Sequence, residues 1–157
     1  MIPQFYKSVT ITPRRNMLQM VVSLEREIGK LPQVDLPIEH FFIPGVYARQ
    51  MTIFEGTALV GRVHKHPCIN IVSKGKITVT TDTGVRTIEA PYTFTSPAGT
   101  KRAGYAHEET IWTTVHLTDE TDVDKIEDAL GTVTYLLLFL FYLGLHCSIL
   151  PTMLAHC

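Results

Sequence analysis

Two histidines spaced two residues apart, His64 and His66, are the side chains of this chain best suited to chemistry. An imidazole can hydrogen-bond a ligand, transfer a proton or bind a divalent metal. Positions two apart on a β-strand project from the same face, so we expect both histidines to point into the interior. Cys68 and Asn70 continue that spacing, although Pro67 interrupts the strand between them.

Two histidines alone would hold a divalent metal weakly, because a catalytic metal normally has about three protein ligands and one open position. A third ligand could come from Asn70, His107 or His116, and spacing does not choose among them. In the alternative interpretation, the histidines line a pocket and hydrogen-bond a ligand or water. Cys68 is expected to be a buried thiol rather than a nucleophile.

The remaining sequence excludes several function classes and leaves enzymatic activity open. It contains no GxSxG, GxxxxGK[ST], HExxH or CxxC motif. Fourteen basic residues face fifteen acidic ones, for a net charge of -1, so we expect no nucleic-acid partner. The three cysteines show no disulfide spacing and favour a reducing compartment. The N-terminus lacks the pattern of a secretory signal.

The elements that must position these side chains are mostly strands. The length of 157 residues fits one domain. Within a first segment, 1–45, apolar residues spaced by three and four predict a helix over 14–28, with Thr12 as N-cap, followed by an irregular lead-in. Over 46–117, eight short runs rich in Val, Ile, Thr and Tyr alternate with turn residues, which predicts an antiparallel sandwich or barrel.

Two further segments follow the strand region. Residues 118–130 are acidic and predict a short helix with a solvated face. Residues 131–157 are apolar and expected to be helical, and Thr132–Leu150 is long enough to cross a bilayer. Three interpretations stay open for this segment: a membrane anchor, a buried helix over the barrel or a dimer interface, and an altered reading frame.

Two segments carry a resemblance to a known family. The run Gly61–Val79, with its glycine, HxH pair and later glycine turn, resembles the first cupin motif. The run Ala90–Arg102, with its PxG turn, resembles the second. The resemblance implies a single cupin-type antiparallel jelly-roll barrel over 46–117. It is closest to small single-domain proteins found in bacteriophage genomes, which implies a location in the host cytoplasm, and such domains commonly form homodimers.

The chain departs from the metal-binding members of that family at two positions. In those proteins, two histidines and a glutamate of the first motif and a histidine of the second hold the metal. Here no glutamate follows His66, and Arg102 stands at the second histidine position. A guanidinium stays charged and does not ligate metals. If Arg102 points inward as that histidine does, the pocket suits a carboxylate, phosphate or nucleotide anion.

The preferred interpretation is therefore a cupin-like protein that binds a small anion through five residues, with affinity that rises as the pH falls through about 6.5. These residues are His64, His66, Asn70, Arg102 and Tyr105, the last with unfavourable strand parity. One alternative is a metal-dependent oxygenase or isomerase that uses a divalent metal on His64 and His66. Another is a structural protein, of the virion or of a host-interaction complex, with the barrel as scaffold. Membrane association would occur through Thr132–Leu150.

Overall fold

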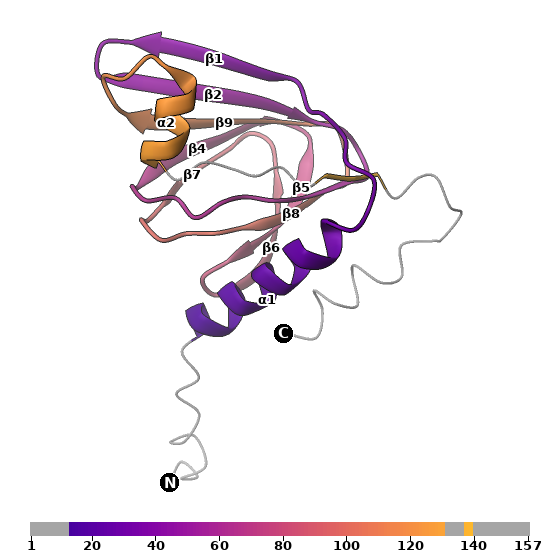
Figure 1. Cartoon of the computed structure of the whole chain (residues 1–157). Coiled ribbons are helices and arrows are strands. Elements are labelled where there is room, and N and C mark those ends of the chain that lie inside the picture. Colours follow the sequence, from indigo (N-terminus) through magenta and orange to yellow (C-terminus); the bar gives the residue numbers. More distant parts are fainter. Residues whose placement is uncertain (1–12, 131–136, 140–157) are drawn as a thin grey trace, which may run out of the picture.

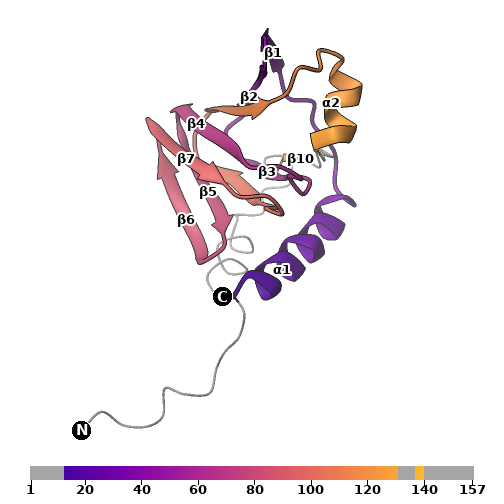
Figure 2. The same ribbon diagram turned by 90° about the vertical axis from the view of Figure 1, so that its left-hand side faces the viewer.

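The computed structural model describes residues 13–130 and 137–139, which form two antiparallel sheets that face each other, with one helix packed on the outside of one sheet and a second helix beside the other (Figures 1 and 2). In chain order the elements are α1 (Pro13–Ile28), β1 (Ile38–Ile43), β2 (Val46–Ile53), β3 (Thr57–Val60), β4 (Cys68–Lys74), β5 (Lys76–Thr81), β6 (Gly84–Glu89), β7 (Tyr92–Ser96), β8 (Ala103–Ala106), β9 (Thr110–Leu117), α2 (Val123–Leu130) and β10 (Leu137–Phe139).

The order of the strands is that of a jelly roll. One sheet has the order β1-β2-β9-β4-β7 and the other β10-β3-β8-β5-β6. Apart from the β5–β6 hairpin, which lies within one sheet, the eight strands β2 to β9 alternate between the sheets as two interleaved Greek keys, the arrangement found in cupins. The predicted antiparallel cupin-type jelly roll is confirmed, and both substantial helices lie outside 46–117 as expected. Among the described residues, the pairings form two separate sheets rather than one continuous barrel wall.

Alternate residues of β2, β4 and β9 point between the sheets, because side chains alternate along a strand. The register aligns these inward residues in rows that change from polar to apolar along the sheet. We call the polar rows, together with His64 and Arg102, the polar end, and the apolar rows the apolar end. The rows pair Tyr47 with His116, Arg49 with Thr114 and Asn70, Cys68 with Ser96, and Met51 with Trp112 and Val72.

Two local features hold the sheets in place. Gly75, in the β4–β5 turn, has a φ of 83°, and a Cβ there would overlap the carbonyl of Glu109. Only glycine therefore lets this turn pack against the β8–β9 turn. Helix α1 lies against β3 and β8, where Val21 and Ile28 join a buried cluster. The structure confirms this helix within one residue of its predicted start, and Thr12 lies outside the described residues.

Three predictions about the remaining segments are resolved by the described residues. The acidic segment contains α2, and its Ile126 is buried against Tyr47. The irregular lead-in was wrong for Ile38–Ile43, which pairs with β2 as the edge strand β1 between Pro37 and Pro44. Helix was also wrong for Leu137–Phe139, which pairs with β3 as strand β10. The rest of 131–157 lies outside the described residues. None of the described helices is long and apolar enough to span a membrane.

Candidate functional site

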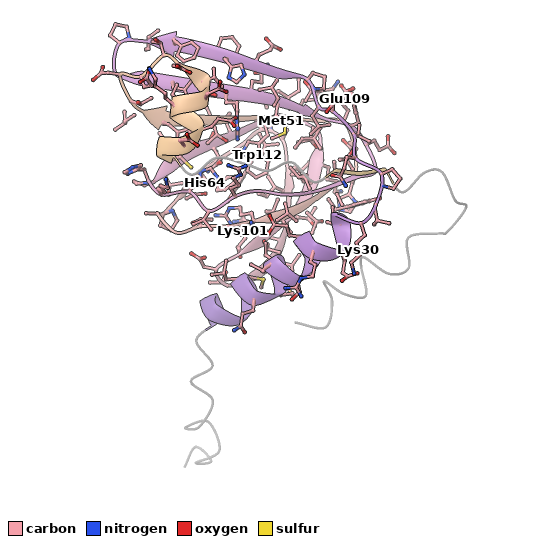
Figure 3. All side chains as sticks on the ribbon, viewed as in Figure 1. Lys30, Met51, His64, Lys101, Glu109 and Trp112 are labelled. Carbon is pink, nitrogen blue, oxygen red and sulfur yellow. The ribbon has the colours of Figure 1, made fainter. Side chains whose placement is uncertain are left out.

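A small cavity lies between the two sheets and is lined by residues of both ends. Its volume is about 70 Å³. Since one water needs ~10–15 Å³ by the same measure, the cavity has room for a few waters or one small polyatomic ion. Figure 3 labels three of the lining side chains, His64, Met51 and Trp112, between the sheets. The polar lining residues are Arg49, His64, Asn70, Ser96, Arg102, Trp112 and Thr114.

Arg102 lies in the β7–β8 connection and reaches this cavity, where its predicted inward direction would put it. Its Nη1 donates to the Thr80 carbonyl at 2.8 Å, and its Nη2 donates to Ser96 Oγ at 3.1 Å. The guanidinium carbon lies 5.4 Å from the centre of the Phe94 ring. Its Nε is buried without a hydrogen-bond partner among the described residues. The hydrogen-bond partners that orient this cation are neutral, and the charge of Asp82 partly compensates the burial that lowers the pKa of Arg102.

A second cation, Arg49, lines the same cavity and was missed from the sequence. It is 4% exposed, and its Nη1 lies 3.7 Å from Glu127 Oε1 of α2. The signal that could have found it is the alternation of β2, where Arg49 shares the inward parity of Tyr47 and Met51. No carboxylate is among the cavity-lining residues in the described part of the chain.

Asn70 occupies the centre of a hydrogen-bond network at the polar end. Its Nδ2 donates to Ser96 Oγ at 2.9 Å. Its Oδ1 accepts from Trp112 Nε1 at 3.1 Å and from Thr114 Oγ1 at 3.5 Å. These partners fix the orientation of the amide, which is 3% exposed. The polar wall beside the two arginines is therefore neutral.

The two histidines of the HxH pair do not share a face. His64 lines the cavity, whereas His66 is exposed, so the inward direction predicted for His66 was wrong. The physical reason is local: 61–67 is not a strand, and strand alternation does not apply there. Instead, the His64 amide donates to the Thr100 carbonyl at 2.9 Å, and the His64 carbonyl accepts from Gly99 at 2.7 Å.

Tyr105 also lies apart from the cavity lining. Its ring packs edge-on against His107 at a centroid distance of 5.1 Å and joins the cluster beneath α1. The opposite strand parity that the sequence shows explains this, because no bulge turns the residue inward. His107 is exposed and bonds Thr78 Oγ1 at 2.6 Å, so it is not a third ligand beside His64.

His64 instead meets two residues of the polar end, Cys68 and His116. The Cys68 Sγ lies 3.7 Å from His64 Nδ1, and the His64 and His116 rings are stacked with centroids 5.6 Å apart. One ligand atom from each of the three residues lies within 4.8 Å of the others. This group could hold a metal ion. Cys68 is buried, as the sequence predicted.

Burial sets the protonation of this group. Burial, together with the charges of Arg49 and Arg102, lowers the pKa of His64 to about 4. Burial likewise lowers the pKa of His116 to about 4 and raises the pKa of the Cys68 thiol. Both imidazoles are neutral at pH 7. The predicted rise of anion affinity near pH 6.5 is therefore displaced toward pH 4 for His64.

Comparison with known proteins gives matches at the level of structure. No protein-family model and no curated protein matches the chain. Several similar solved structures are cupins. A cupin superfamily protein from Desulfitobacterium hafniense has 11% identity, a TM-score of 0.49, and coverage of 56% of this chain and 82% of its own. The KdgF protein of a Halomonas species has 17% identity, a TM-score of 0.48, and coverage of 58% and 91%.

A variant of salicylate 1,2-dioxygenase from Pseudoaminobacter salicylatoxidans has 15% identity and a TM-score of 0.49 over 77% of this chain and 36% of its own. These similarities are distant, so the chemistry of this chain must be inferred from its own side chains. The phage origin, the homodimer, the location in the host cytoplasm and the segment boundaries given above stay predictions.

Proposed function

We propose that this chain binds a small anion in the cavity between its sheets. One observation carries the proposal: two guanidinium groups, Arg49 and Arg102, line a cavity whose described lining contains no carboxylate. The volume of about 70 Å³ limits the ligand to a group the size of a carboxylate or a single phosphate. A whole nucleotide would need one of the larger pockets typical of small-molecule sites.

The energetics of the polar end favour the same ligand. A buried charge is costly unless a partner compensates it. Glu127 offsets Arg49 from α2 at 3.7 Å, whereas Arg102 donates hydrogen bonds to a carbonyl and a hydroxyl and has, among the described carboxylates, only the nearby charge of Asp82. An anion would add a countercharge inside the cavity, whose described lining has none, and accept charge-assisted hydrogen bonds, which are about twice as strong as neutral ones. The neutral amide of Asn70 would not repel it.

The test is a titration of the purified full chain with acetate and with sulfate, followed by calorimetry and by fluorescence. Trp112 is the single tryptophan of the chain and lines the cavity, so its emission reports on occupancy. Arg102→Ala should weaken binding about 30-fold, since a hydrogen bond to a charged group contributes roughly 2 kcal/mol. Arg86→Ala is the matched control, because Arg86 is exposed and lies outside the cavity lining. Equal affinities for the two variants, or no binding of either anion, would reject the proposal.

The sequence left two alternative functions open, a metal-dependent enzyme and a structural scaffold, and the structure bears on them differently. A metal-dependent enzyme built on His64 and His66 lacks support, because His66 is exposed and outside the cavity lining. A scaffold without a ligand stays a prediction, and the same titration tests it. If the anion proposal fails while the protein is folded, the scaffold becomes the better interpretation.

A further inference from the structure

We infer that His64, Cys68 and His116 form a metal site for a borderline-soft divalent ion, with Zn²⁺ as the clearest match, and that the anion of the cavity occupies the remaining coordination position. The last step rests on the proposed function, while the metal site itself does not. The three residues come from three places in the chain: the connection before β4, the start of β4, and β9.

The distances within the cluster are those of a metal site that needs little adjustment. For tetrahedral zinc, bonds of about 2.3 Å to sulfur and about 2.0 Å to nitrogen place the ligand atoms roughly 3.3–3.8 Å apart. The separation of Cys68 Sγ and His64 Nδ1 is 3.7 Å, and the whole group lies within 4.8 Å. Three protein ligands and one open position match the count of sites that bind a ligand on the metal.

A second observation points to a missing ligand. His116 is 3% exposed, and its Nδ1 is buried without a hydrogen-bond partner among the described residues. Such atoms are rare in native structures and call for an explanation, one of which is a bound ion. Stacking on Tyr47, with centroids 6.3 Å apart, and on His64 holds the His116 ring in place.

The chemistry of the cluster selects the class of metal. Two imidazoles and a thiolate suit zinc and related transition metals, whereas Mg²⁺ and Ca²⁺ require oxygen ligands. The thiol would lose its proton on binding, as coordinating thiols do. The thiolate then offsets one of the two metal charges beside the arginines, and one positive charge remains.

That remaining charge explains the link to the cavity. His64 belongs both to the cluster and to the cavity lining, so an anion in the cavity lies beside the metal. An anion there would bridge the metal and the guanidinium groups that otherwise repel it. Metal and anion should therefore each increase the affinity for the other, by the same factor.

The test uses the full chain, stripped with a chelator under a phosphine reductant and titrated with Co²⁺. One Co²⁺ per chain should bind and show the thiolate-to-cobalt absorption of the near ultraviolet and the intense visible bands of four-coordinate cobalt, and Zn²⁺ should displace it. Cys68→Ser should abolish the thiolate band, and His116→Ala should weaken binding at least tenfold. His66→Ala is the matched control and should bind as the parent does.

A separate control is needed for Cys147 and Cys157 of the segment 131–157, because these two thiols could also bind cobalt. A variant with both changed to serine should keep the thiolate band. Absence of the band in folded protein, or its persistence in Cys68→Ser, would overturn the metal site. The variants must retain the melting profile of the parent for this comparison, and His116→Gln replaces His116→Ala if the latter unfolds.

The link to the anion is tested by repeating the cobalt titration in saturating acetate. We expect cobalt affinity to rise at least fivefold, and this gain to disappear in Arg102→Ala. Acetate binding to the stripped protein without cobalt binding would overturn the metal site and leave the proposed function standing. If acetate binds but leaves the cobalt affinity unchanged, the anion does not occupy the remaining coordination position of the metal. Cobalt binding without any anion binding would overturn the proposed function alone.

Discussion

The polar and the apolar ends of the sheet interior share strands β2 and β9, yet the side chains that they bring inward differ in chemistry. At the apolar end, Ile53 and Ile77 are almost completely buried in one hydrophobic cluster. At the polar end, Arg49, Asn70 and His116 are 3–4% exposed. The inward side chains of the strands are thus buried at both ends, and the two ends differ in the polarity of those side chains.

This comparison separates stability from binding. Apolar burial stabilises the fold by about 25 cal/mol per Å² of surface removed from water. Buried polar groups cost free energy unless they are bonded, and at the polar end Arg102 Nε and His116 Nδ1 have no hydrogen-bond partner among the described residues. A ligand that satisfies such groups would stabilise the native state by mass action. The contribution of the polar end to the stability of the fold should thus depend on whether a ligand is bound there.

The largest effect is expected at the apolar end. Ile77→Ala should lower the free energy of unfolding by about 2–5 kcal/mol, because Ile77 is 1% exposed and packs in the central cluster. Urea denaturation measures the change. The matched control is Ile69→Ala on the outer face, where the side chain is 45% exposed and the loss should be much smaller. Comparable losses at the two isoleucines would show that packing at the apolar end does not provide the expected stability.

Turn residues and alternation predicted the antiparallel strands, because both are local properties of the sequence. The jelly roll and the inward Arg102 were predicted from the resemblance to the cupin motifs. The sequence could not bring Cys68 and His116 together, since β4 and β9 meet only through the sheet topology. It also misplaced His66, because the residues up to Pro67 were predicted to continue a strand, whereas 61–67 is an irregular connection. Arg49 could have been found from its parity on β2, but arginine side chains are so rarely buried that an exposed position was the default expectation.

A second prediction concerns the pH dependence of the free energy of unfolding, to which the buried histidines of the polar end contribute. Unfolded histidines have a pKa near 6.5, whereas burial holds the pKa of His64 and of His116 at about 4. Between these values the unfolded chain binds more protons, so stability falls as the pH drops from 6.5 to 4. Each histidine adds up to about 1.4 kcal/mol per pH unit.

Urea denaturation of chelator-treated protein across this pH range measures that slope. Carboxylates also titrate below pH 5, so the difference between the parent and His116→Gln isolates one histidine. The variant should show the shallower dependence between pH 6.5 and 4.5. The same slope in both proteins would mean that His116 does not resist protonation in the native state.

The smallest effect is expected where the two ends meet, at Trp112. Its ring lies opposite Met51 and Val72 of the apolar end, while its Nε1 donates to Asn70 Oδ1 of the polar end at 3.1 Å. Trp112→Phe removes this donor and reduces the ring. Because Asn70 Oδ1 keeps Thr114 as a longer-range donor at 3.5 Å, the bond itself should contribute only about 1 kcal/mol.

A double-mutant cycle separates that bond from the loss of ring packing. Trp112→Phe, Asn70→Ala and the double variant are denatured in urea, and the coupling energy is the departure from additivity. We expect about 1 kcal/mol of coupling, with a further packing loss that is the same whether or not Asn70 is present. A coupling near zero would show that the two ends are energetically independent where they touch. Coupling that grows when acetate is bound would show instead that ligand binding tightens the network from the polar end into the apolar one.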